Sequence, residues 1–181
     1  MDLLIKKAQK GDEQAFIQVI DECLPQMYKV AKTRLKNEED IGDAIQETIL
    51  ACFKNIKKLK NPCFFKTWLI KILINKCNDI LGSNKIIYVD DFSEVMDHSV
   101  DIKVEDIIEE KLDFQSVLSI LNPDYRLVIV LYYVNRFNIK EISEILNEKE
   151  GTIKSRLSRA RQQLKMHYVK LESESFGNGG C

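Results

Sequence analysis

Residue patterns that mark enzymes are scarce in this chain of 181 residues. It contains only two histidines and seven glycines, and neither histidine has the spacing that a metal site needs. The sequence offers no phosphate-binding glycine loop and no Ser/His/Asp set. We therefore expect no catalytic residues, no metal and no cofactor, and an enzyme is the least supported class of protein.

Long apolar runs are missing as well. Residues 1–7 lack the apolar stretch of a signal peptide, and no later run approaches the roughly 18 residues that a membrane span needs. The five cysteines are odd in number and include no C-x-x-C pair, and four of them lie within apolar helical patterns. We expect a cytoplasmic protein whose cysteines are buried free thiols rather than metal ligands.

Charge is distributed unevenly along the chain, although the formal net charge is only −1. Residues 1–82 hold 14 basic and 11 acidic residues, residues 83–113 hold 3 and 10, and residues 114–181 hold 10 and 7. Two mildly basic blocks therefore flank an acidic one. A chain of this length with 45% hydrophobic residues can bury one moderate core or two small ones.

The first basic block has the periodicity of helices. Apolar residues recur at three- and four-residue intervals in three stretches, 13–36, 41–56 and about 64–81. Asp12 can start the first helix and Gly82 can end the last. Pro25 lies inside the first pattern and is expected to kink or split that helix, because proline lacks the N–H that a helix interior needs. Three or four helices in a compact bundle are predicted.

The acidic segment has no such periodicity and is interpreted as a solvated linker at residues 83–104. Within it, residues 86–89 favour a short extended piece. A helical pattern resumes at Glu105, and Asn122 can cap the helix that follows it. The predicted fold is all-α, with small helical domains at 1–82 and 105–172, the linker between them, and a flexible tail at 173–181.

Two helices separated by a polar turn follow near the end of the chain. The first spans 138–146, the turn spans 147–150 and the second helix opens at residue 151, which is the spacing of a helix-turn-helix. Seven apolar side chains can pack the two helices together: Ile142, Ile145, Leu146, Ile153, Leu157, Ala160 and Leu164. The sequence therefore predicts a module that places its second helix in the major groove of DNA.

Polar residues of the second helix fall on one outward stripe. The stripe that would face base edges consists of Lys154, Ser155, Ser158 and Arg159. Arg156, Arg161 and Lys165 lie beside it and suit phosphates, which position a protein without reading sequence. A plain solvated face is the alternative. It gives no reason for the basic stripe to begin directly at the turn, so DNA binding is favoured.

These motifs resemble those of the extracytoplasmic-function sigma factors of the sigma-70 family, two-domain subunits that direct bacterial RNA polymerase to promoters. GTIKSRL at 151–157 with RAR at 159–161 is similar to the helix that binds the minus-35 element, which adds Thr152 to the candidates. DAIQET at 43–48 is similar to the motif that docks on the polymerase clamp coiled coil. FKTWLIKILIN at 65–75 is similar to the minus-10 region. The resemblance covers nearly the whole chain.

The resemblance implies roles for residues of the first block. Asp43, Gln46 and Glu47 would bind core polymerase from one exposed helix face, since they lie at i, i+3 and i+4; helix solubility is the alternative. A loop that pockets a flipped non-template base would include Leu59, Lys60, Asn61 and Phe64. Lys71 and Asn75 would contact the same strand on later turns. Trp68 is better explained as a core aromatic residue.

The resemblance also implies partners and regulation. They are core RNA polymerase, promoter DNA and an anti-sigma factor that is often membrane-embedded, without a small-molecule substrate. NEED at 37–40 and FFKTW at 64–68 look most like the sub-class linked to envelope stress. The acidic linker would mimic nucleic acid in the polymerase channel, although a solvated spacer explains it equally well. Gly42 and Gly82 depart from positions where the family often has an acidic and a basic residue.

One rival function remains open at this point. An ordinary helix-turn-helix regulator would use its N-terminal half to bind a ligand or to dimerise, and would act without replacing the housekeeping sigma factor. It predicts tight, autonomous and two-fold symmetric DNA binding in the absence of polymerase.

Overall fold

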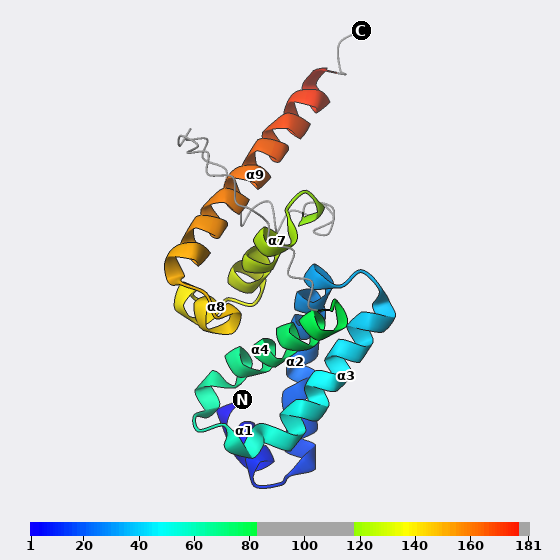
Figure 1. Cartoon of the computed structure of the whole chain (residues 1–181), viewed down its shortest axis with the longest axis vertical. Coiled ribbons are helices and arrows are strands. Elements are labelled where there is room, and N and C mark those ends of the chain that lie inside the picture. Colours follow the sequence, from blue (N-terminus) through cyan, green and yellow to red (C-terminus); the bar gives the residue numbers. More distant parts are fainter. Residues whose placement is uncertain (83–117, 178–181) are drawn as a thin grey trace.

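The computed structural model describes residues 1–82 and 118–177, with side chains to residue 169. Figure 1 shows these parts as helices joined by short turns, with no strand in either range. The N-terminal helices form a bundle, and the C-terminal helices pack against one end of it through a shared apolar core. The all-α prediction is confirmed, whereas the predicted linker at 83–104 and the pattern resuming at Glu105 lie outside the described residues.

The N-terminal bundle contains the three predicted helices and one more. Its elements are α1 (Asp2–Gln9), α2 (Glu13–Arg34), α3 (Glu38–Asn55), 3₁₀ turns at Ile56–Lys58 and Pro62–Phe64, and α4 (Phe65–Ile80). Asp12 caps α2 by accepting a hydrogen bond from the amide of Ala15 at 3.0 Å. Gly11 precedes that cap with a φ of +100°, a conformation that glycine adopts without strain.

Of the two alternatives predicted for Pro25, a split is wrong, because helix α2 runs without a break through the proline; a kink stays a prediction. Val19, Met27 and Val30 are completely buried and lie on both sides of the proline. Their packing holds the two halves in one helix. Pro25 has no N–H to donate to the carbonyl of Asp21, four residues earlier. Both residues are exposed, so water can satisfy that carbonyl.

The C-terminal helices form the predicted helix-turn-helix. Helix α7 (Pro123–Ile129) continues into a π-helical turn at Val130–Val134 (η3), and α8 (Ile139–Leu146) and α9 (Glu150–Gly177) follow. Asn138 and Glu141 form a capping box at the start of α8, and Asn147 ends that helix in the left-handed conformation. Helix α9 projects from the body in Figure 1 and stays helical to Gly177, into the range predicted as a flexible tail.

None of the helices in the described ranges combines the length and the apolarity that crossing a bilayer takes. Three cysteines of the N-terminal bundle, Cys23, Cys52 and Cys77, are free and buried as predicted, but Cys63 is exposed in the turn before α4. Burial raises the pKa of the Cys52 thiol to about 12 and that of Cys77 to about 11.

The buried thiols are expected to resist alkylation in the folded protein. At pH 8 only roughly one Cys52 side chain in 10⁴ would be the reactive thiolate, because its pKa lies far above that pH. Iodoacetamide treatment followed by peptide mass spectrometry should find Cys63 modified and Cys23, Cys52 and Cys77 protected until guanidinium unfolds the chain. Modification of Cys52 as fast as Cys63 in the folded protein would contradict this assignment.

Candidate functional site

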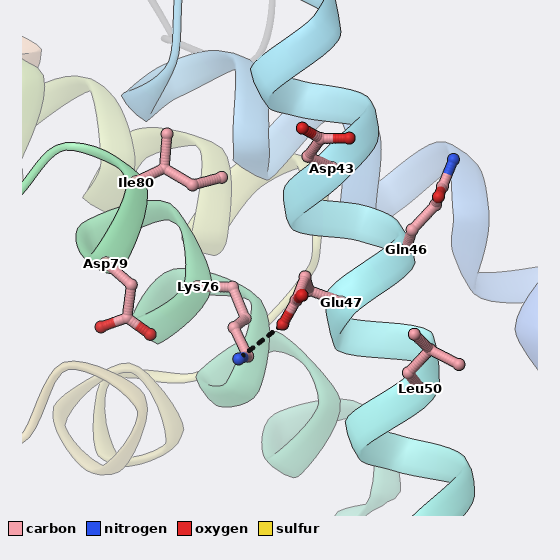
Figure 2. A pocket seen from close by; sticks show the side chains of 7 residues that line it. All are labelled: Asp43, Gln46, Glu47, Leu50, Lys76, Asp79 and Ile80. Carbon is pink, nitrogen blue, oxygen red and sulfur yellow. Dashed lines mark hydrogen bonds and ion pairs between the residues drawn. The ribbon is translucent and has the colours of Figure 1, made fainter.

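A first candidate surface lies where α3 passes α4. The predicted docking residues Asp43, Gln46 and Glu47 are exposed and border an open hollow of about 490 Å³. Helix α4 contributes Lys76 and Asp79 to the same hollow, which Figure 2 shows with Glu47 reaching across to Lys76. The structure therefore brings the three predicted residues together on one face.

The side chains of the three predicted docking residues differ in how strongly they are held within the protein. The carboxylate of Glu47 lies 2.8 Å from Nζ of Lys76, and this hydrogen bond lowers the pKa of Glu47 and raises that of Lys76. Asp43 and Gln46 make no hydrogen bond or ion pair within the described parts of the chain. These two side chains are thus available to a partner, whereas Glu47 already has one.

Apolar residues extend this surface in a way that the sequence did not reveal. Leu50 is 56% exposed and Phe53 is 53% exposed, although Phe53 belongs to the apolar helical pattern of residues 41–56, whose apolar face was expected to be buried. The ring of Phe53 meets that of Phe16 edge-on at 5.1 Å, so it covers the rim of the core rather than filling it. The spacing of Asp43, Gln46, Leu50 and Phe53 along one helix stripe is the signal that could have predicted this.

A second hollow, of about 390 Å³, lies between the far end of α3 and the start of α4. Leu59 and Lys60 line it together with Lys58 and the half-buried Trp68, which packs against the core. Asn61 and Phe64 do not line it. The Asn61 side chain accepts a hydrogen bond from the amide of Cys63 and so shapes the turn.

Helix α1 fixes the loop beside the second hollow. The Gln9 amide donates hydrogen bonds to the carbonyls of Ile56 and Leu59, at 3.0 and 2.7 Å. The sequence analysis did not predict α1. It did not predict the role of Gln9 either, because the hydrogen bonds of Gln9 join residues about fifty positions apart. The loop conformation therefore depends on the first helix of the chain.

Lys71 and Asn75 lie apart from this hollow, on the side of α4 that faces α8. The Lys71 ammonium group donates to the backbone carbonyl of Glu144 at 2.8 Å. Asn75 lines a narrow space of about 160 Å³ between α4 and the C-terminal helices. The structure thus divides the predicted minus-10 residues into two groups.

The predicted base-reading stripe lies on the outside of α9. Lys154, Ser155 and Ser158 are exposed, and Thr152 and Arg159 are half-buried. The residues predicted to pack α8 against α9 are buried, except that Leu146 is half-buried. The helix-turn-helix has the predicted geometry, and the stripe is exposed as predicted except at the half-buried Arg159.

Two arginines predicted to bind phosphates are engaged within the protein. Arg156 pairs with Glu148 at 2.9 Å and with Asp124 at 3.7 Å. Arg161 donates to the Tyr133 hydroxyl at 2.7 Å, and its guanidinium lies over the rings of Tyr132 and Tyr133. These contacts hold α9 to its own domain, while Lys165 is half-buried further along the helix. A phosphate role for all three stays a prediction.

A further hollow, of about 650 Å³, opens beside the first turn of α9, and the sequence analysis did not identify it. Arg136, Lys140 and Lys154 line it, with one carboxylate, Glu150. Arg136 has a φ of +60°, which is uncommon for a residue with a side chain. The hollow places two more cations beside the predicted reading stripe.

Comparisons with known proteins show which family the chain is similar to. Residues 19–85 match the model of sigma-70 region 2, and residues 111–164 match that of sigma-70 region 4. The sigma factor SigW of Bacillus subtilis is 29% identical to this chain, in an alignment that covers 91% of this chain and 97% of SigW. SigE of Mycolicibacterium smegmatis is 30% identical over 176 residues, covering 91% of this chain and 67% of SigE.

A solved structure shows the same fold. The sigma factor RpoE of Bartonella quintana, crystallised with the anti-sigma factor NepR, superposes with a TM-score of 0.59 at 24% identity. The match covers 83% of this chain and 94% of that protein.

Arg156 is expected to stabilise the domain. Replacing it in Arg156→Ala leaves the half-buried Glu148 without its partner, so the free energy of unfolding should fall by roughly 1–3 kcal/mol in urea denaturation followed by circular dichroism. The matched control is Lys154→Ala, which removes an exposed cation from the same helix and should change stability by less than about 0.5 kcal/mol. Equal stability of the two variants would show that the Arg156 ion pairs contribute nothing.

Proposed function

Because the chain belongs to the extracytoplasmic-function sigma factors of the sigma-70 family, we propose that its three surfaces act together on a promoter. Helix α3 docks on core RNA polymerase, the loop beside Trp68 takes a base of the opened proximal element, and α9 reads the upstream element. The observation that carries this proposal is that three sets of exposed or half-buried side chains lie on separate surfaces, in the chain order that the motifs predict.

The proposed docking surface combines apolar area with polar groups that have no hydrogen-bond partner among the described residues. Asp43 and Gln46 offer an acceptor carboxylate and an amide, and Leu50 and Phe53 offer apolar area on the same stripe. An interface of this kind has an apolar centre and a polar rim, and a cationic partner helix would complement it. The pairing of Glu47 with Lys76 implies that Glu47 contributes less to docking than Asp43 does.

The double variant Asp43→Ala/Gln46→Ala is expected to weaken binding to sigma-free core polymerase by roughly tenfold or more, because it removes two contacts near the centre of the interface. Surface-immobilised core polymerase and purified full-length chain would measure the dissociation constant. The control Gln18→Ala/Asp21→Ala removes the same residue types, also three positions apart and exposed, from α2. Undiminished binding by the folded test variant would remove the docking proposal.

The second hollow supports capture of an unstacked base. Trp68 provides an aromatic face, and Lys58 and Lys60 provide positive charge at the rim. Base stacking on aromatic side chains tolerates any sequence and is strengthened by cations that follow the backbone. The loop held by Gln9 presents this hollow to a strand that has already left the duplex.

The upstream element would be read by the outward stripe of α9. Lys154, Ser155 and Ser158 can reach base edges in the major groove from the first turns of the helix. Arg136 and Lys140, at the neighbouring hollow, are placed to bind the phosphates that flank those bases. This arrangement adds phosphate contacts that do not depend on Arg156 or Arg161.

Removing a base-reading cation and removing a phosphate-binding cation are expected to change the binding of upstream sequences in different ways. Lys154→Ala should change which upstream sequences the holoenzyme prefers, at a cost of roughly 1–3 kcal/mol on the favoured base. Lys140→Ala should weaken all upstream sequences about equally and lower the salt dependence by about one ion. A library of promoters with randomised upstream elements, bound at two salt concentrations, measures both effects. Identical sequence preference in wild type and both variants would refute the base-reading role of Lys154.

Run-off transcription from a promoter library tests the proposal as a whole. Purified protein with sigma-free core polymerase should give start sites that share two spaced elements, and core polymerase alone should not. Specific DNA binding without any initiation above the core-only level would instead support the helix-turn-helix regulator.

Regulation and location follow from the same proposal. The relative from Bartonella quintana is bound to an anti-sigma factor, and we propose that a partner of this kind, membrane-anchored in the stress-responsive sub-class, controls this chain as well. Because its partner polymerase works on the chromosome, we place the chain in the cytoplasm. The chain supplies binding surfaces, and the polymerase supplies the catalytic step.

A further inference from the structure

The hollow proposed to take a base has apolar walls on two helices. Ala51 of α3 and, one turn apart on α4, Trp68 and Ile72 are half-buried and line it, and Leu59 of the loop adds a fourth apolar side chain. Its volume of about 390 Å³ lies within the range of small-molecule sites. Every base has a flat face that stacks on an aromatic ring, so these walls can bind any of the four bases. Selection among the bases therefore depends on the polar groups of the hollow.

Hydrogen-bond donors outnumber acceptors among the polar side chains of the hollow. They are Asn55, Lys58 and Lys60, and no carboxylate lines the hollow in the described parts of the chain. The Asn55 amide is already engaged on both sides. Its nitrogen donates to the Ala51 carbonyl at 2.9 Å, and its oxygen accepts from the Lys58 ammonium group at 2.9 Å. The side-chain groups left for a base are therefore ammonium N–H groups.

Two carbonyls of the loop beside the hollow are also occupied. Gln9 donates to the carbonyl oxygens of Ile56 and Leu59, at 3.0 and 2.7 Å. A base that brings an amino group to this side of the hollow meets further donors, and a polar group buried without a partner costs free energy. A base that brings a carbonyl oxygen or a ring nitrogen instead gains a hydrogen bond from a charged donor, which is stronger than a neutral one.

The two lysines are held differently. The hydrogen bond to Asn55 fixes Lys58, and it uses one of the three N–H groups of the ammonium, so the others remain for a base. Lys60 makes no hydrogen bond or ion pair with any described residue. A donor held in one place can distinguish the edges of bases, whereas a free lysine suits phosphates, which position a strand without reading its sequence.

We propose that Lys58 reads the captured base and selects guanine or thymine over adenine or cytosine. Guanine offers O6 and N7 as acceptors and thymine offers O4, whereas adenine and cytosine carry amino groups at the matching ring positions. Lys60 binds the adjoining phosphate and does not select. The proposal rests on base capture beside Trp68, which belongs to the function proposed above.

The captured position is located first. Holoenzyme assembled from sigma-free core polymerase and the full-length chain is titrated with fluorescein-labelled single strands that carry the non-template sequence of a promoter recovered by run-off transcription. Each strand has an abasic site at a different position. The captured position is the one at which the loss of affinity caused by the abasic site disappears in Trp68→Leu, which removes the stacking ring but keeps an apolar side chain. Trp68→Met replaces this variant if the leucine variant does not fold.

Four strands with A, C, G or T at the captured position then test the selection. Wild-type holoenzyme should bind the G and T strands about three- to tenfold more tightly than the A and C strands. Lys58→Glu exchanges the donor for an acceptor and should favour A and C. Lys58→Gln offers both kinds of group and should bind all four strands within about twofold. The matched control Lys60→Gln, in the same hollow, should weaken all four strands equally.

The outcomes separate this proposal from the function on which it rests. If no abasic position depends on Trp68, base capture is refuted, and the reading role of Lys58 is refuted with it. If one position depends on Trp68 but wild type prefers A or C there, base capture stands and the proposed selection is overturned. The same conclusion follows if wild type and both folded Lys58 variants share one order of preference.

Discussion

The packing of α3 against α4 is the contact on which both N-terminal surfaces depend. Ala44, Thr48 and Cys52 recur every four residues along α3 and are completely buried. Because these side chains are small, α4 can approach closely with Leu69 and Leu73, which are also buried. The helices run antiparallel, so the docking hollow forms at one end of the pair and the Trp68 hollow at the other. One seam of small residues therefore sets how closely the two helices approach at both the proposed polymerase contact and the proposed base pocket.

The basic residues of α9 illustrate how one helix divides its charges between two tasks. Lys154 extends into solvent, whereas Arg156 and Arg161, on the flanks, bind carboxylates and phenol rings of the same domain. Arginine suits the second task because its planar group can pair, donate and stack at once. Arg156 and Arg161, which are basic like the outward stripe, thus hold that stripe in its orientation.

Periodicity predicted α2, α3, α4 and the helix-turn-helix because each buries an apolar face at regular spacing. It missed α1, in which only Ile5 and Ala8 are buried, and it misplaced Phe53, whose ring covers the edge of the core. The candidate residues could be named from the motifs, but their partners could not. The pairing of Arg156 with Asp124 joins residues that only the folded chain brings together.

The two hydrogen bonds from Gln9 to the loop at Ile56 and Leu59 have a consequence for folding order. The Ile56 carbonyl also accepts the Leu59 amide in the 3₁₀ turn, whereas the Leu59 carbonyl accepts no backbone hydrogen bond from the described residues. The loop therefore acquires its full shape only after a contact across about fifty residues has closed. Fraying of the first helix would release the loop while α2, α3 and α4 stayed packed. The N-terminal bundle could therefore keep the proposed docking surface while the proposed base pocket is lost through fraying of α1.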